Sequence, residues 1–507
     1  LTGQLIAEYK GVFGKHDINV LGGWSAEENL YEDLQGKRTN IVGNELPALN
    51  LGDTDGWSNA ADENEWALLS GFMRASYAFA AKYLVEVNFR ADASSRFSKK
   101  NRWGVFPSAS VGWRITEEKF MQNQHIFDNL KLRASWGQLG NQNGLGLYDH
   151  IASYNINGYY PFKSELGQWA VISKLPSESR TWETVEVKNI AVDMAFLRNR
   201  LTVTGEYFIK KNKDMLVSIE IPSIIGIDVP TGNYGELKVK GWEVTVGWQD
   251  KIKDFSYGAR FNLSDQKDKL VDYGVEYNGF VAGVNQKVQG YSLGSIFGYR
   301  TDGYFTSEEE VKNSAAFNKA ITGVGDIKYI DKDGDGKISA PNDLEYLGTT
   351  TPRYTFGLNL TAAWKGFDLG VLLQGVGKRN FYLSSEVMNP YYATWNNFSY
   401  KMHNDYWTPE NAAFPRYYAG ANHNYQISDH WLQNAAYVRL KNLQLGYTIS
   451  PKLTRSWGIQ RLRVYFSGDN LCEYSKLNDN FDPELSDING YVYPIMRNFS
   501  FGINVTL

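Results

Sequence analysis

Residues 499–507 read Phe-Ser-Phe-Gly-Ile-Asn-Val-Thr-Leu, and their pattern is the first indication of the fold. Every second side chain is large and apolar, and those between are small or polar, which predicts a strand with one apolar and one polar face. A soluble sheet seldom leaves such a strand as its last element, whereas a membrane barrel uses it to close the sheet. The stretch therefore predicts a barrel strand if the other strands follow the same rule.

Composition favours a β-rich chain and excludes several classes of protein. The 507 residues include 74 aromatic residues (15 Trp, 33 Tyr and 26 Phe) and 48 glycines but only 14 prolines. A net charge of −4 with dispersed signs gives no reason to expect a nucleic-acid partner. The single cysteine, Cys472, cannot form an internal disulfide, and no Cys/His group has zinc spacing. No run of 18 apolar residues exists, which excludes helical membrane spans but not barrel strands.

Fifteen segments of the chain show the alternating pattern, and we expect each to be a strand. They are residues 3–13, 17–26, 66–79, 82–92, 104–115, 129–138, 183–196, 200–210, 238–249, 255–267, 353–363, 367–376, 433–447, 460–468 and 495–507. Their connections alternate between short and long, apart from the intermediate links 93–103, 116–128 and 448–459. The long connections are 27–65, 139–182, 211–237, 268–352, 377–432 and 469–494. Short periplasmic turns and long extracellular loops predict an outer-membrane barrel of a Gram-negative bacterium, crossing the membrane many times.

The two faces of the expected strands support this layout. Apolar Trp242, Val244, Val246 and Trp248 alternate with Glu243 and Thr245, and Tyr354, Phe356, Leu358 and Leu360 alternate with Thr355, Asn359 and Thr361. In a membrane barrel the apolar face meets lipid and the polar face lines the lumen. The pattern therefore predicts outer-membrane lipid as a contact of the sheet.

Six blocks of sequence also resemble one family. They are RFSKKNRWGVFPSASVGWRITEEKF (96–120), LKLRASWGQ (130–138) followed by Gly140-Asn141, GDIKY (325–329) running into DKDGDGKI (331–338), TPRYTFG (351–357), WTPEN (407–411) and FDPE (481–484). Their order and spacing are similar to those of the SusC/RagA family of TonB-dependent outer-membrane transporters. The resemblance covers essentially the whole chain.

The resemblance implies protein parts that the fifteen expected strands do not include. Members of that family have an N-terminal plug, a segment that contacts the TonB complex, a barrel of 22 strands and a SusD-like surface lipoprotein that closes over the barrel. Fifteen strands would be strands 8 to 22, so we expect residues 1–507 to be one partial barrel. The plug is absent from this chain, and about half of the polypeptide would be missing or carried by another chain.

One segment has the spacing of a calcium loop. Asp331, Asp333 and Asp335 supply carboxylates at positions 1, 3 and 5, Gly336 permits the sharp turn, and Lys337 offers its carbonyl at position 7. Position 12 is Asn342 where an EF-hand has a bidentate Glu, so we expect the next residue, Asp343, to close the site, with Glu345 as the alternative. The prediction is one structural Ca²⁺ at 331–343, within the 268–352 loop. The alternative is an acidic surface turn that holds no ion.

Substrate contacts are expected from aromatic side chains in the long loops. These residues are Trp57, Tyr159, Tyr160, Tyr391, Tyr392, Trp395, Tyr417 and Tyr418. Aromatic rings stack on sugars or pack against peptide side chains. The same rings could instead anchor the loops or form the seam with a lipoprotein lid, and the sequence leaves both readings open.

Signatures of enzymes are absent from the sequence. It contains no H-E-x-x-H, G-x-S-x-G or P-loop motif. We expect His423 and His430 to be solvated in a polar loop. Asp482 and Glu484 are only two residues apart, so we expect them to fix a loop rather than to catalyse glycoside hydrolysis. The predicted function is TonB-dependent import of a bulky nutrient, either oligosaccharide or peptide; the alternative is a surface or secreted glycan-binding β protein or glycoside hydrolase.

Overall fold

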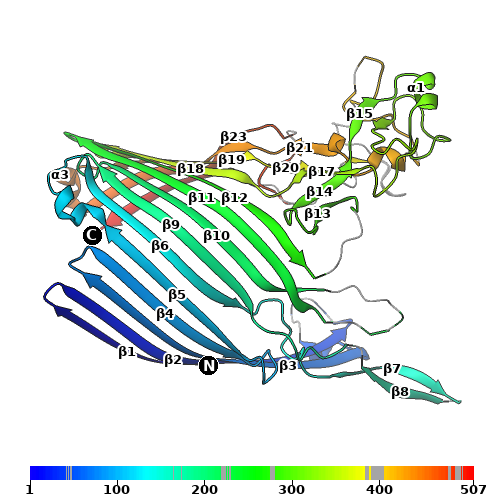
Figure 1. Cartoon of the computed structure of the whole chain (residues 1–507), viewed down its shortest axis with the longest axis horizontal. Helices are drawn as coiled ribbons and strands as arrows, with labels where there is room; N and C mark the ends of the chain where they lie inside the picture. The colour runs from blue at the N-terminus through cyan, green and yellow to red at the C-terminus, as the bar shows by residue number, and fades with distance from the viewer. Residues whose placement is uncertain are drawn as a thin grey trace. The chain divides into compact units, whose positions relative to one another are not determined.

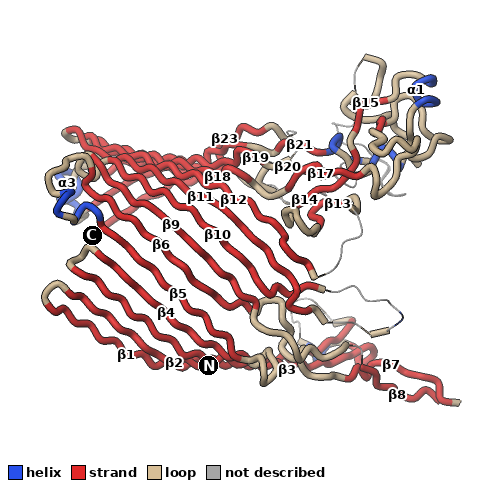
Figure 2. The backbone as a smooth tube through the Cα atoms, in the orientation of Figure 1, coloured by secondary structure: helices blue, strands red, loops and turns tan. Residues whose placement is uncertain are grey.

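The computed structural model shows a chain whose regular secondary structure is mainly β-strand. It describes all residues except 42, 44, 46–47, 164, 173, 219–223, 225, 228–229, 275–279, 383–387, 390–404, 411, 419, 478–480, 486–492 and 494. Among these described residues, helical structure is confined to short segments such as α1 (Glu308–Asn313) and α3 (Pro451–Thr454) (Figure 2). Within the described residues, no helix has the length and apolar character needed to cross a bilayer.

Fifteen antiparallel strands form one sheet, which confirms the predicted number (Figure 1). In sheet order they are β1 (Thr2–Phe13), β2 (His16–Thr39), β3 (Asp53–Phe79), β4 (Tyr83–Ser94), β5 (Trp103–Arg114), β6 (Phe127–Asn141), β9 (Glu183–Phe196), β10 (Leu201–Val217), β11 (Gly232–Ile252), β12 (Phe255–Tyr273), β18 (Arg353–Trp364), β19 (Phe367–Lys378), β22 (Tyr437–Thr448), β23 (Arg461–Ser475) and β24 (Asn498–Thr506). This order follows the chain, and β1 and β24 stand at its two ends.

The chain divides into two compact units. Unit 1 comprises Leu1–Arg114, Arg133–Lys188 and Lys210–Glu236, and unit 2 comprises Ile115–Leu132, Asn189–Ile209 and Leu237–Leu507. Unit 1 carries the loop hairpin formed by β7 (Tyr154–Phe162) and β8 (Glu165–Ile172). Unit 2 carries the longest loops.

Strand register in unit 2 separates apolar from polar side chains, as the alternation predicts. Leu358 of β18 lies between Phe261 of β12 and Leu373 of β19, so apolar side chains meet across three strands. On the opposite face, the hydroxyls of Ser264 and Thr355 are 2.7 Å apart. Cross-strand pairs of like character stabilise a sheet and fix its register, because a slip by one residue would exchange the faces.

Two strands are much longer than predicted. The alternating pattern indicated 17–26 and 66–79, but β2 and β3 continue as a two-stranded ribbon past the ends of their neighbours β1 and β4. The paired positions include Glu32 opposite Glu63 and Asp33 opposite Asp62. Because both faces of this ribbon are exposed, no periodic burial marks it in the sequence. The 27–65 connection is therefore not a simple loop.

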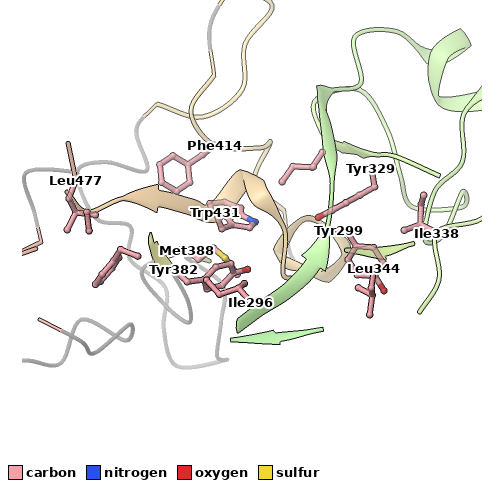
Figure 3. Close-up of a cluster of buried hydrophobic side chains, with 13 residues drawn as sticks. Ile296, Tyr299, Tyr329, Ile338, Leu344, Tyr382, Met388, Phe414, Trp431 and Leu477 are labelled. Atoms are coloured by element: carbon pink, nitrogen blue, oxygen red, sulfur yellow. The ribbon is translucent and has the colours of Figure 1, made fainter. Parts of the chain in front are cut away.

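The 268–352 connection is also structured. It contains β13 (Gly283–Gln286), β14 (Ser295–Tyr299), β15 (Thr301–Tyr304), α1, β16 (Ile327–Tyr329) and β17 (Leu344–Thr349). The later connection adds β20 (Asn380–Tyr382) and β21 (Leu432–Asn434). Together with Leu477, which follows β23, these connections build a hydrophobic core, which we call the loop core: Ile296, Tyr299, Ile327, Tyr329, Ile338, Leu344, Phe381, Tyr382, Met388, Phe414, Trp431, Ala435 and Leu477 (Figure 3). These loops therefore fold as a packed body with its own interior.

Candidate functional site

A polar trough lies on the wall of unit 1. Alternate residues Glu86, Asn88, Arg90 and Asp92 of β4 share one face, and small residues such as Ser108 lie across from them on β5. Long side chains facing small ones leave a cavity of about 550 Å³, which β6 completes. Phe106 and Trp136 also line the cavity, so apolar rings lie beside these polar groups. Such a mixed surface suits the passage of a solute more than a closed catalytic pocket.

The charges in this trough are already paired with protein groups. The Nε of Arg90 lies 2.9 Å from both carboxylate oxygens of Asp92. Glu86 accepts hydrogen bonds from the Ser76 hydroxyl at 2.8 Å and from the Asn88 amide at 3.1 Å. The wall therefore offers polar contacts without a large unbalanced charge.

Three of the predicted aromatic residues in unit 1 are exposed. Trp57 lies on the β2–β3 ribbon with the Arg38 guanidinium 5.1 Å from the centre of its ring. Tyr159 and Tyr160 lie on β7 and are 69% and 59% exposed. These rings are accessible for stacking, but their role as substrate contacts stays a prediction.

The predicted aromatics of unit 2 differ from those of unit 1. Tyr417 packs against the loop core, and its ring lies near Tyr406 and Phe414. Tyr418 donates a hydrogen bond from its hydroxyl to Asp326 at 3.1 Å, and burial raises the pKa of Tyr418 to about 12. Both contacts anchor the loop. Tyr391, Tyr392 and Trp395 lie outside the described residues.

Asp326 is the polar centre of the loop body, and sequence reasoning did not single it out as a functional residue. Its side chain is fully buried and accepts hydrogen bonds from Arg416 at 2.8 and 2.9 Å. Further donors are the Asn424 amide at 2.9 Å and the Gly323 N–H at 2.9 Å. Burial alone would raise the pKa of Asp326, but hydrogen bonds from His423, Arg416 and Asn424 hold it well below its usual value.

The two loop histidines correct one prediction. His423 was expected to be solvated, but it is buried, and its Nε2 lies 3.0 Å from Asp326. The Nε2 of His430 lies 3.2 Å from the hydroxyl of Tyr304, and burial lowers the pKa of His430. The polar neighbours that suggested solvent are instead hydrogen-bond partners of the two rings, and they allow His423 to be buried and His430 to be partly buried.

The acidic loop is held between two residues of the loop core. Tyr329 precedes it and Ile338 follows it, and both are about 5% exposed. The carboxylates of Asp331, Asp333 and Asp335 each place an oxygen within 4.8 Å of the others. The backbone therefore brings three hard oxygen ligands together, which fits a calcium ion.

Hydrogen bonds inside the loop explain its curl. The two oxygens of Asp331 accept the N–H groups of Gly334 at 2.7 Å and Gly336 at 2.8 Å. The Gly336 N–H in particular holds the pKa of Asp331 below its usual range. Asp343 is buried, and its two oxygens accept the N–H groups of Lys332 and Ser339 at 2.7 Å each. Asp343 thus joins the two ends of the loop.

Asp482 and Glu484 fix a loop, as the sequence indicates. Buried Arg439 on β22 lies 2.8 Å from Asp482 and 3.0 Å from Glu484. Lys441, two residues further along the same strand, lies 2.6 Å from Glu484. The two carboxylates are therefore held by cations from one strand rather than placed on either side of a cavity.

Comparison with known proteins assigns the family. The model of the TonB-dependent receptor-like β-barrel matches residues 2–471. The chain belongs to this family. Its members are outer-membrane transporters and not enzymes, which confirms the predicted location and the expectation that the chain is not an enzyme. The SusC/RagA resemblance is confirmed by relatives along nearly the whole chain.

These relatives are longer than this TonB-dependent receptor barrel. The chain is 30% identical to TonB-dependent receptor P26 of Formosa agariphila over 98% of its own length and 52% of that protein. It is 27% identical to TonB-dependent receptor SusC of Bacteroides thetaiotaomicron over 86% of its length and 43% of SusC. The chain thus spans about half the length of the curated relatives it matches.

A solved structure supports the fold. The RagAB peptide transporter matches with a TM-score of 0.84 at 24% identity, over 99% of this chain and 55% of that chain. The likeness extends to the sheet of fifteen strands, so the partial-barrel prediction is confirmed.

Proposed function

We propose that the whole protein imports a bulky nutrient, an oligosaccharide or a peptide, across the outer membrane. The described chain would supply strands 8 to 22 of a 22-stranded barrel, and the plug and first strands would come from the remainder of the protein. The TonB complex would supply the energy through that remainder. A SusD-like surface lipoprotein would close over the long loops, as the resemblance to SusC and RagA suggests.

The observation that carries this proposal is the polar trough on a sheet of barrel strands. Arg90 is paired with Asp92, and the Glu86 carboxylate accepts hydrogen bonds from neutral groups, so a polar solute can pass along the trough without being held by a single strong ion pair. The packed loop core gives the extracellular side a rigid surface against which a lid can close. These features match a capture and release function better than a chemical reaction.

Uptake of labelled substrates by cells tests this proposal. Cells that produce the full-length protein with its lipoprotein are offered fluorescent oligosaccharides and peptides, with and without an uncoupler of the inner membrane. We expect one class to accumulate, and the uncoupler to abolish accumulation. Uptake that is unaffected by the uncoupler would indicate a passive pore and contradict the proposal.

We also propose that the acidic loop binds one structural Ca²⁺. Asp331, Asp333, Asp335 and the carbonyl of Lys337 would hold it. Asp343 lies outside the group of three converging carboxylates, and both of its oxygens accept backbone N–H groups, so it would close the site only through its remaining lone pairs. The ion would neutralise carboxylates that otherwise repel one another. Since the loop lies between Tyr329 and Ile338, ordering it would stiffen the loop body.

Calcium titration of the full-length barrel tests the site. We expect Ca²⁺ to slow hydrogen exchange in residues 329–343, and Asp333→Ala with Asp335→Ala to abolish this effect while the barrel still assembles. Asp302→Ala, which removes an exposed carboxylate in the same loop body, is the matched control. An unchanged exchange rate at saturating Ca²⁺ would refute the site, and a full response in Asp343→Ala would transfer the closing role to Asn342 or Glu345.

A further inference from the structure

The apolar face of the last strands in unit 2 is hollowed into a groove of about 480 Å³. Strand register places Phe367, Tyr447, Val464 and Ile503 in one row, and Leu445, Phe466 and Phe501 in the next. Two aromatic pairs border it: Phe367 with Tyr447, whose ring centres are 4.6 Å apart, and Phe466 with Phe501 at 5.3 Å. A furrow between ring pairs on a lipid-facing surface has the chemistry of a hydrocarbon chain site.

The groove lies near the end of the barrel that carries the short connections. Phe367 directly follows the two-residue turn Lys365-Gly366, and the N–H of Thr448 donates to the carbonyl of Gly366 at 2.7 Å. The N–H of Gln460 donates to the carbonyl of Thr506 at 2.9 Å, which ties the next link to the same end. In the proposed orientation this is the periplasmic end, where the membrane leaflet consists of phospholipid.

The link between β22 and β23 at this end is not a tight turn. It forms α3 and a 3₁₀ turn over Arg455–Trp457, and among residues 451–458 only Thr454 is buried. Leu453 and Trp457 are 62% and 66% exposed. Lys452 and Arg455 are also exposed. Exposed Trp and Leu beside Lys and Arg are typical of a segment that rests on a membrane interface.

We propose that an anionic phospholipid of the periplasmic leaflet binds at this corner of the barrel. One acyl chain lies in the groove along Val464 and Ile503, and the phosphate lies near Lys452 and Arg455. Lys365, whose Nζ lies 5.4 Å from the ring centre of Trp364, adds a third positive charge at the same end. Apolar and cationic groups together select an anionic lipid. A lipid without net charge would gain only the acyl-chain contacts in the groove and not the attraction between its head group and the cations. The inference rests on the proposed orientation and not on transport activity.

The other long link at this end offers an internal comparison. Residues 115–128 also expose apolar side chains, with Phe120 at 69% and Ile126 at 67%. This link, however, carries Glu117 and Glu118 next to Lys119, so it lacks the positive charge of the 448–459 link. Only the latter combines interfacial side chains with an excess of cations.

Native mass spectrometry of the full-length transporter tests the charge part of the site. The protein in mild detergent is mixed with equal amounts of phosphatidylglycerol and phosphatidylethanolamine, without substrate. We expect phosphatidylglycerol to be enriched among the bound lipids. Lys452→Gln and Arg455→Gln should each lower the enrichment about fivefold, since a cation near an anionic surface contributes about 1 kcal/mol. Lys119→Gln, in the acidic link, should leave it unchanged.

A second variant tests the groove. Val464→Trp fills the furrow while leaving the cations in place, so we expect bound phosphatidylglycerol to fall; Val105→Trp, on the exposed apolar side of β5, is the control. Equal binding of the two lipids by the wild-type protein, or an unchanged enrichment in Lys452→Gln/Arg455→Gln, would overturn the proposal. If Val464→Trp fails to assemble, the Lys452→Gln and Arg455→Gln variants, which change exposed residues, still test the lipid site. Loss of uptake with normal lipid binding would count against the proposed function alone.

Discussion

Arg416 forms a two-point ion pair with Asp326, with its Nε 2.8 Å from Oδ1 and its Nη2 2.9 Å from Oδ2. The two residues belong to different connections of the barrel, so this pair joins loops that are 90 positions apart in the chain. The same carboxylate receives donors from Tyr418, His423 and Asn424. One buried side chain thus links the two longest loops.

Asp326→Ala should therefore loosen the loop body without unfolding the barrel. Removing one partner of a buried network leaves the other groups unsatisfied, and we expect a loss of about 3–5 kcal/mol of local stability. Hydrogen exchange of residues 299–330 and 416–431 in the intact protein measures this. Asp302→Ala, which breaks an exposed pair with Lys328, should cost less than about 1 kcal/mol. Equal exchange in both variants would show that Asp326 does not hold the loops together.

Charge should be tolerated on one face of β11 only. Gly247 lies next to the Thr202 hydroxyl, so Thr245, two residues away, shares the polar face, and Val246 lies on the other. Val246→Arg should cost about 2–4 kcal/mol if it lies near the membrane midplane, and Thr245→Arg much less. Folding into lipid vesicles at graded urea concentrations measures both. Similar penalties would indicate a sheet that is buried on both sides.

Acid should release the loop that follows β6. Asp149 is partly buried, which by itself would raise its pKa, but Lys174, Arg180 and the Gly146 N–H lower it to about 2. Since the unfolded value is about 3.9, this stability is present above about pH 4 and is lost as pH falls toward 2.

Limited proteolysis of residues 142–182 with an acid-active protease checks this release. Cleavage should rise between pH 4 and pH 2, and Asp149→Asn should be cleaved readily throughout that range. A wild-type loop that stays protected at pH 2 would contradict the role of these ion pairs.

Two glycines should respond differently to an added methyl group. A Cβ on Gly140 would lie 2.1 Å from the ring of Phe106, whereas a Cβ on Gly370 would meet nothing within 4 Å. Gly140→Ala should cost about 1–3 kcal/mol through overpacking, and Gly370→Ala should be neutral or slightly stabilising. Urea unfolding of the full-length barrel checks the pair. A neutral Gly140→Ala would mean that the Phe106 ring can move aside.

Alternation located the strands wherever lipid and water faced opposite sides of the sheet. β18 was predicted as 353–363 and spans Arg353–Trp364, because each side chain there has a defined environment. The β2–β3 ribbon was missed because Glu32 and Asp33 are both exposed, which removes the alternation. From the sequence, the trough could be predicted only as the polar face of a strand. Its cavity depends on which side chains of β5 lie opposite those of β4, and the sequence alone does not give that register.

The loop site was predictable only where its residues are close in sequence. The spacing of Asp331, Asp333 and Asp335 indicated that they converge, and they do. Asp326 contacts Arg416 and His423, which lie some ninety residues later in the chain. No local sequence pattern predicts a contact between residues so far apart in sequence. His423 was assigned to solvent for the same reason.

The facing carboxylates of the β2–β3 ribbon affect how readily the edge of the ribbon pairs with other molecules. Glu32 lies opposite Glu63 and Asp33 opposite Asp62, which weakens the ribbon because like charges repel across the ladder. An unpaired edge of this length would otherwise recruit strands from neighbouring molecules. Pairing two such ribbons would bring further carboxylates together, so we expect electrostatic repulsion to oppose aggregation through this edge. Acidic or high-salt solutions would weaken that protection, since protonation removes the charges and ions screen them.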